Sequence, residues 1–200
     1  MKTIAVALMA VMAITSAQSQ VFEGETTGEQ RAGAWSSFMI ARQGDVRFRA
    51  YTFNDNLGLI VDVFPPSCLA SISFAAPYSA PASSDAPASM IPGALRIDLG
   101  AVYSISTTTG AVSMGDTLVI LTLNQTPEFG SILTEMTNGQ MLRARFDVQG
   151  YGGAYKSFPL NGFATSLQRI TGVCKQVADS AGHGAGKRTK PSERSSSSAL

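Results

Sequence analysis

The chain has 200 residues, among them 15 Lys or Arg, 14 Asp or Glu, two Cys and one His. When residues 1–19 and 180–200 are set aside, ten basic and 13 acidic side chains remain, a net charge of −3. A mildly acidic body with a basic tail is not the charge distribution of a nucleic-acid-binding protein, which needs basic groups clustered on one face, so no nucleic-acid partner is expected. About 180 residues suffice for one domain with its own hydrophobic core.

Residues 1–19 have the features of a signal peptide. Lys2 precedes an apolar run over 4–14, and the small residues 15–17 suit cleavage after Ala17 or Ser19. The alternative, a buried N-terminal helix, is disfavoured by the polar, Gly-rich segment 20–34 that follows. The apolar run is also shorter than the roughly 20 residues that a membrane-spanning helix requires. We therefore expect an exported protein without a membrane span, located in the periplasm or outside the cell.

Between Trp35 and Leu160 the sequence is mostly strand-like. Apolar and polar residues alternate in 46–53 and 141–148, the period of a strand with one buried face. Segments 57–64 and 116–123 are continuously apolar, as in strands buried on both faces. Further strands are predicted at 35–41, 68–74, 94–99, 101–106 and 155–160. Many short strands separated by turn residues favour an antiparallel β-sandwich or a barrel-like domain, which we place at residues 20–179.

Two segments interrupt the strands. Residues 77–92 are rich in Pro, Ala and Ser and are predicted to form a long surface loop. Residues 180–200 are small, polar and basic, which predicts a disordered Ser-rich tail.

The end of the domain changes from strand to helix. Phe163, Leu167, Ile170 and Cys174 are spaced by four, three and four residues, which places them on one face of a helix over about 162–177. In an exported protein two cysteines are normally oxidised, so we predict a Cys68–Cys174 disulfide that fastens this helix to the sheet. Two separate buried thiols are the alternative.

The sequence offers little for catalysis. The single histidine, His183, lies in the predicted tail, so no rigid nucleophile–base pair, metal site or cofactor site is expected. A hydrolase that uses two carboxylates stays open. The carboxylates of the folded part are Asp45, Asp55, Asp62, Asp98, Asp116, Glu128, Glu135 and Asp147, and their spacing selects no pair.

Arginine is the more distinctive feature. Arg47 and Arg49 share one face of their predicted strand, and Arg143 and Arg145 share one face of another. If the two strands are neighbours, four guanidinium groups form a patch for a sulfate, phosphate or carboxylate ligand. The alternative is a sheet face on which Asp45, Asp62 or Asp147 lies between the arginines.

Two motifs resemble a known family. The segment "GQMLRARFDV" followed by "FPLNGFATSLQRI", together with "MIPGALRIDLG", is similar to the invasion-associated locus B family of the periplasm of Gram-negative bacteria. The resemblance covers about residues 90–174. It implies an exported β-sandwich that interacts with an envelope or host-surface component, with no catalytic residues to carry over. We therefore expect a non-enzymatic interaction or binding module, with the carboxylate hydrolase and an anion binder as alternatives.

Overall fold

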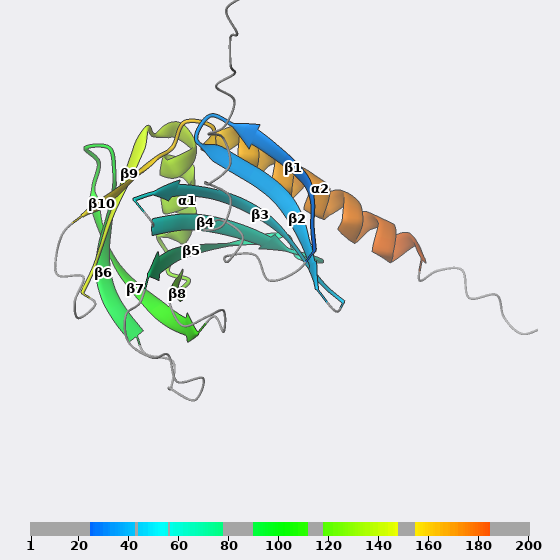
Figure 1. Ribbon diagram of the computed structural model, residues 1–200, viewed down its shortest axis with the longest axis horizontal. Helices are drawn as coiled ribbons and strands as arrows, with labels where there is room; N and C mark the ends of the chain where they lie inside the picture. The colour runs from blue at the N-terminus through cyan, green and yellow to red at the C-terminus, as the bar shows by residue number, and fades with distance from the viewer. Residues whose placement is uncertain are drawn as a thin grey trace, which may run out of the picture.

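In the part of the chain that the structure describes, ten strands pair in one antiparallel sheet, and a long C-terminal helix packs against it (Figure 1). The computed structural model describes residues 25–42, 44–55, 57–77, 90–111, 118–147 and 155–184. The predicted signal peptide, residues 78–89 of the predicted loop, and residues 185–200 lie outside this range.

The strand order is β1-β2-β3-β4-β5-β8-β7-β6-β9-β10, and over the described strands the sheet is not closed. The strands are β1 (Glu25–Ala32), β2 (Trp35–Arg42), β3 (Asp45–Asn54), β4 (Leu57–Phe64), β5 (Leu69–Pro77), β6 (Met90–Ile97), β7 (Val102–Ala111), β8 (Leu118–Leu123), β9 (Met141–Phe146) and β10 (Lys156–Pro159). The helices are α1 (Phe129–Asn138) and α2 (Phe163–Gly184).

The sheet is strongly curved, and both helices lie on its inner side (Figure 1). Its two ends approach each other where the β1–β2 turn meets the connection from β10 to α2. There the Ala34 N–H donates to the Asn161 carbonyl (3.0 Å), and the Trp35 indole N–H donates to the Pro159 carbonyl (2.9 Å). Gly162 has φ +94°, and a Cβ at this position would overlap the Ala32 carbonyl. The close approach therefore requires glycine.

The main core fills the space between the inner face of the sheet and the two helices. Trp35 is fully buried with its ring centroid 4.7 Å from that of Phe163, so β2 and the first turn of α2 share this core. Phe74 packs against Phe146 and Phe158, with centroids 4.8 and 5.8 Å away. These contacts join the middle of the sheet to β9 and β10.

The predicted fold class is confirmed in its mainly β, antiparallel character and in the C-terminal helix packed on the sheet, but the described strands form one open sheet and not the two packed sheets of a β-sandwich. The strands form a single curved sheet of ten. The Cys68–Cys174 disulfide is also confirmed, with the two Cα atoms 5.9 Å apart and Cys174 fully buried. It fastens α2 to the start of β5.

Two elements were not predicted, and some boundaries differ: residues 90–92 of the predicted surface loop belong to β6. β1 was not expected, because its side chains are polar and almost all exposed, as an edge strand allows. α1 was also missed, although Phe129, Ile132 and Met136 recur at helical spacing and are buried. Helix α2 continues to Gly184, so residues 180–184 of the predicted disordered tail are helical.

Gly172, in the middle of α2, offers a stabilising substitution. A Cβ at this position would meet nothing within 4 Å, and glycine in a helix interior costs about 0.5–1 kcal/mol relative to alanine. We expect Gly172→Ala to raise the free energy of unfolding by about that amount. Urea unfolding measures it, and Gly162→Ala, where the added methyl meets backbone, is the control of opposite sign. Destabilisation by Gly172→Ala would contradict the open surroundings of this residue.

Candidate binding site

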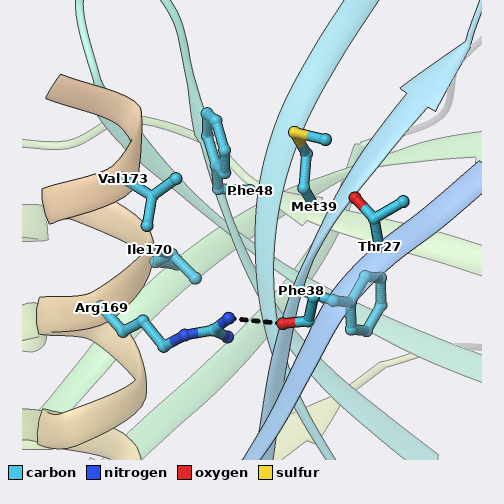
Figure 2. Close-up of a pocket in the computed structure, with 8 residues that line it drawn as sticks. Thr27, Phe38, Met39, Phe48, Arg169, Ile170 and Val173 are labelled. Atoms are coloured by element: carbon cyan, nitrogen blue, oxygen red, sulfur yellow. Dashed lines mark hydrogen bonds between the residues drawn. The ribbon is translucent and has the colours of Figure 1, made fainter. Parts of the chain in front are cut away.

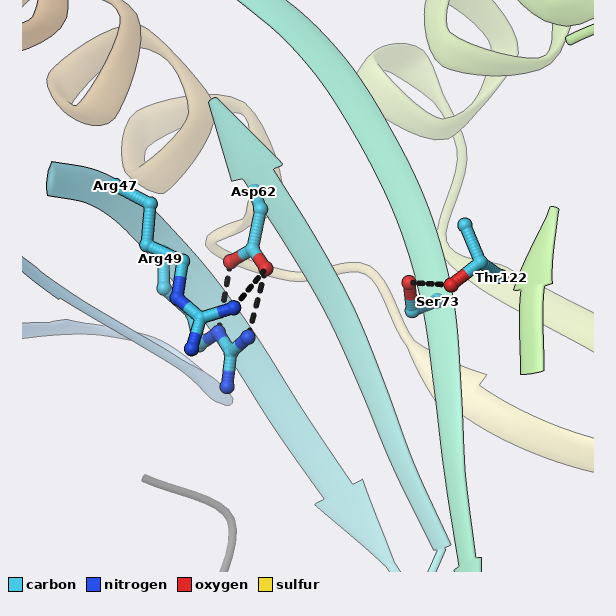
Figure 3. A network of polar contacts seen from close by, with 5 residues as sticks. All are labelled: Arg47, Arg49, Asp62, Ser73 and Thr122. Atoms are coloured by element: carbon cyan, nitrogen blue, oxygen red, sulfur yellow. Dashed lines mark hydrogen bonds and ion pairs between the residues drawn. The ribbon is translucent and has the colours of Figure 1, made fainter. Parts of the chain in front are cut away.

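A buried ion pair lies on the outer face of the sheet, the face turned away from the helices. Arg49 on β3 donates to Asp62 on β4 from Nε to Oδ1 and from Nη2 to Oδ2, both at 2.7 Å (Figure 3). Both residues are 6% exposed. Nη1 of Arg47 lies 4.0 Å from Asp62 Oδ2. Asp62 therefore lies beside both Arg47 and Arg49 and neutralises Arg49, as predicted by the interpretation in which a carboxylate separates the arginines on the sheet face.

Apolar side chains and a tyrosine surround this ion pair on the outer face: Phe38, Ile40, Tyr51, Ile60 and Ala75. Burial raises the pKa of the Tyr51 phenol; a hydrogen bond with Ser36 opposes the rise and the charge of Glu29 adds to it. Beside the ion pair, the hydroxyls of Ser73 and Thr122 lie 3.1 Å apart and join β5 to β8 (Figure 3). This part of the outer face is thus a packed second core.

The four predicted arginines do not form one patch. Arg47 and Arg49 lie on β3, the third strand in the sheet, whereas Arg143 and Arg145 lie on β9, the ninth. Five strands separate the two pairs, so the condition that their strands be neighbours is not met.

A different arginine joins the β9 pair. Arg96 on β6 is directly opposite Arg143 on β9, and Ala94 is opposite Arg145. The neighbouring residues Leu95, Ile97, Leu142 and Ala144 are buried in the main core, so all three arginines are on the outer face. We call Arg96, Arg143 and Arg145 the arginine cluster.

The arginine cluster has few partners of its own. Arg143 Nη1 donates to the Asp98 carbonyl at 3.0 Å, and Arg145 Nε lies 3.8 Å from Asp147 Oδ1. That Nε is buried without a hydrogen-bond acceptor among the described residues, and the Arg145 guanidinium lies 5.7 Å from the centroid of the Tyr155 ring. Arg96 makes no hydrogen bond or ion pair with the described part of the chain.

The carboxylates are mostly engaged by the protein itself or exposed at turns. Asp62 binds Arg49, and Asp98 accepts the backbone N–H groups of Gln140 (3.0 Å) and Met141 (2.8 Å). Asp45, Asp55 and Glu128 are exposed, and Asp116 lies outside the described residues.

Glu135 on α1 accepts a hydrogen bond from the Tyr103 hydroxyl on β7 at 2.6 Å. This bond to a carboxylate is the main reason that the pKa of Tyr103 is raised above its usual value of 10.0; desolvation and the charges of Glu135 and Glu128 add to it.

We expect Glu135→Gln to lower the pKa of Tyr103 toward 10.0, because the charge that favours the neutral phenol is removed. A raised pKa contributes stability that is present below the ordinary pKa and is lost as the pH rises through the folded value. The variant should therefore lose less stability than the parent between neutral and strongly alkaline pH. Phenolate absorbance against pH measures the shift, with Glu128→Gln as the weaker control. Identical titrations of the parent and Glu135→Gln would contradict the assignment.

An apolar pocket of about 180 Å³ lies between α2 and the first strands (Figure 2). On the helix side it is lined by Arg169, Ile170 and Val173, and on the sheet side by Thr27 and Gly28 of β1, Phe38 and Met39 of β2, and Phe48 of β3. Arg169 Nη1 donates to the carbonyl (2.6 Å) and the hydroxyl (2.7 Å) of Ser37, and Nη2 donates to the Gly28 carbonyl. We call this cavity the helix pocket.

Sequence reasoning missed Arg96 and Arg169. The alternation of 94–99 was a signal for the outer-face position of Arg96, but its position opposite Arg143 depends on the strand register. Arg169 could not be identified from the sequence, because its contacts to Gly28 on β1 and Ser37 on β2 depend on how α2 packs across the two strands, and β1 was not predicted.

Within the described residues, no three His, Cys, Asp or Glu side chains are grouped so that they could hold a metal ion. Neither described helix is both long and apolar enough to cross a membrane.

Comparison with known proteins returned no match: none among protein-family models, none among curated proteins and none among solved structures.

Proposed function

We propose that this protein is an exported, non-enzymatic binding module of the bacterial envelope or the extracellular space, and that its arginine cluster binds anionic groups. The observation that carries the proposal is the cross-strand pair Arg96–Arg143, with Arg145 on the same face of β9. The expected ligand carries sulfate, phosphate or carboxylate groups, as sulfated or phosphorylated glycans do.

The physical argument is electrostatic. Side chains directly opposite each other in antiparallel strands have Cβ atoms about 4.5–5.5 Å apart, and like charges at that position destabilise the pair. Asp147 is 3.8 Å from Arg145 and is half exposed, so it screens only one end of the cluster. An anion bound between Arg96 and Arg143 removes the repulsion and accepts charge-assisted hydrogen bonds from planar guanidinium groups.

The contacts of Arg143 and Arg145 hold the cluster in place before a ligand arrives. The Asp98 carbonyl fixes Arg143, and the Tyr155 ring lies beside the Arg145 guanidinium. Side chains that are already ordered lose less conformational entropy on binding, which favours affinity.

Export is supported by the disulfide and by the signal-like residues 1–19. A buried disulfide that joins residues 106 positions apart is typical of proteins from oxidising compartments. The resemblance to the invasion-associated locus B family, carried by segments of about residues 90–174, points to the same compartment and to an interaction role. That assignment belongs to the proposal.

To test anion binding, we would replace Arg96 and Arg145 with glutamine and measure affinity for a sulfated glycan at several salt concentrations. We expect at least a tenfold loss and a shallower dependence on salt, since two charge-assisted contacts are removed. The matched control is Arg31→Gln/Lys175→Gln, which removes the same charge from exposed positions on β1 and α2. Equal losses of affinity in both double variants would contradict a binding site at the cluster and would mean that net charge alone accounts for the binding.

Export is tested separately, by fractionating cells that express the full chain and determining the N-terminus of the product by mass spectrometry. Cleavage after Ala17 or Ser19, with both cysteines protected from thiol reagents, is expected. An uncleaved cytoplasmic product would contradict the proposed compartment.

A secreted hydrolase that uses a carboxylate pair is the competing class. A screen of glycoside and ester substrates, followed by alanine at Asp45, Asp55 and Glu128, separates it from the binding module. Turnover abolished by one of these substitutions would favour the enzyme.

A further inference from the structure

The helix pocket is a second candidate site, separate from the arginine cluster. Its walls are mainly apolar, and Met39, Phe48, Ile170 and Val173 contribute side chains from three different elements (Figure 2). The disulfide at Cys174 follows Val173 directly, so one wall of the pocket is covalently held to the sheet. A wall held in this way keeps the pocket formed without a ligand.

The size of the pocket limits what it can hold. Apolar cavities of about 150 Å³ in proteins accommodate a single benzene-sized group. At about 180 Å³ the helix pocket has room for one short apolar group and not for a long acyl chain.

Arg169 adds a charge at one end of the pocket, between α2 and β1 (Figure 2). Its contacts to Ser37 and Gly28 engage Nη1 and one N–H of Nη2. Nε–H and the second N–H of Nη2 have no acceptor, and no carboxylate lies within ion-pair distance, among the residues that the structure describes. Nε and Nη2 form an edge of the guanidinium that binds a carboxylate through two parallel hydrogen bonds.

We propose that the helix pocket binds a small molecule with one short apolar group and one carboxylate. The apolar group lies among Met39, Ile170 and Val173, and the carboxylate accepts hydrogen bonds from Nε and Nη2 of Arg169. Apolar burial supplies affinity, and the guanidinium selects acids over neutral analogues. Because Arg169 is already held by Ser37 and Gly28, it needs little reordering when the ligand binds.

The test compares 3-phenylpropionate with 3-phenylpropanol on the full chain by calorimetry. We expect the acid to bind at least tenfold more tightly than the alcohol, the ratio that one charge-assisted contact supplies. Val173→Phe adds bulk to the apolar wall of the pocket one helical turn after Arg169, and it should abolish binding of both compounds. Val177→Phe, one turn further along α2 at a position 37% exposed, should leave binding unchanged. Arg169→Gln should remove the preference for the acid, with circular dichroism confirming that the helix is retained.

Three results overturn the proposal: no binding of the acid to the parent, equal affinity for acid and alcohol, or unchanged binding in Val173→Phe. If Arg169→Gln fails to fold, the comparison of acid with alcohol and the Val173→Phe variant still decide the matter. Loss of 3-phenylpropionate binding in the arginine-cluster variant Arg96→Gln/Arg145→Gln, with binding retained in Arg169→Gln, would place the carboxylate at the cluster and also overturn the proposal. The proposal for the helix pocket and the proposal for the arginine cluster can therefore be contradicted independently of each other.

Discussion

Replacing Cys68 with serine lowers the free energy of unfolding by roughly 4 kcal/mol, the expected effect of opening a loop of about 100 residues. The disulfide spans 106 residues and fastens α2 to the start of β5. For a domain of this size the loss corresponds to a fall in Tm of about 10–15 °C. The fluorescence of Trp35, the single tryptophan, follows the transition because its ring packs against Phe163 at the start of α2.

The parent protein in a reducing agent is the control for this variant. It should unfold at the temperature of Cys68→Ser, and the variant itself should not respond to the reducing agent. A difference below about 1 kcal/mol between oxidised and reduced parent would mean that packing alone holds α2 on the sheet.

Replacing Asp62 with alanine removes about 3–5 kcal/mol of stability, because the Arg49 guanidinium then loses the carboxylate that neutralises it in a buried position. Chemical unfolding of the parent and the variant measures the loss. Most of this loss is the cost of leaving the Arg49 charge buried without a counter-charge. The loss is therefore larger than the free energy by which the intact ion pair stabilises the fold.

Two further variants make this prediction specific. Arg49→Met/Asp62→Leu removes both charges and should recover most of the stability, since apolar replacements of a buried pair are often neutral. Asp147→Ala breaks the exposed pair with Arg145, whose side chain is 39% exposed, and should cost less than about 1 kcal/mol. A loss in the double variant as large as that in Asp62→Ala would contradict the charge argument.

Much of the fold was predictable because its strands follow simple periodicities. The alternation in β3 and β9 placed Phe48 and Ala50, and Leu142 and Ala144, in the main core. The uninterrupted apolar run of β4 matched a strand buried on both faces. The helical spacing of Phe163, Ile170 and Cys174 placed all three against the sheet. These patterns are local, so each could be recognised from a few neighbouring residues.

The arginine cluster could not be predicted from such local patterns. The alternation on β9 assigned Arg143 and Arg145 to one face, but it contained nothing about which strand would lie beside them. In the sheet, β6 lies between β7 and β9, and β3 lies toward the opposite end. Arg96 therefore takes the position that Arg47 and Arg49 were considered for. The helix pocket likewise depends on β1, an exposed edge strand without an apolar period.

By itself the sequence determined the mainly β class, the C-terminal helix and the cysteine pair, because periodicity and composition act over short distances along the chain. The tertiary structure alone decided the strand order, the pairing of Arg96 with Arg143 and the pocket beneath α2. Each of these depends on contacts between residues far apart in sequence. Such contacts follow from the way the curved sheet packs as a whole, which no local pattern encodes.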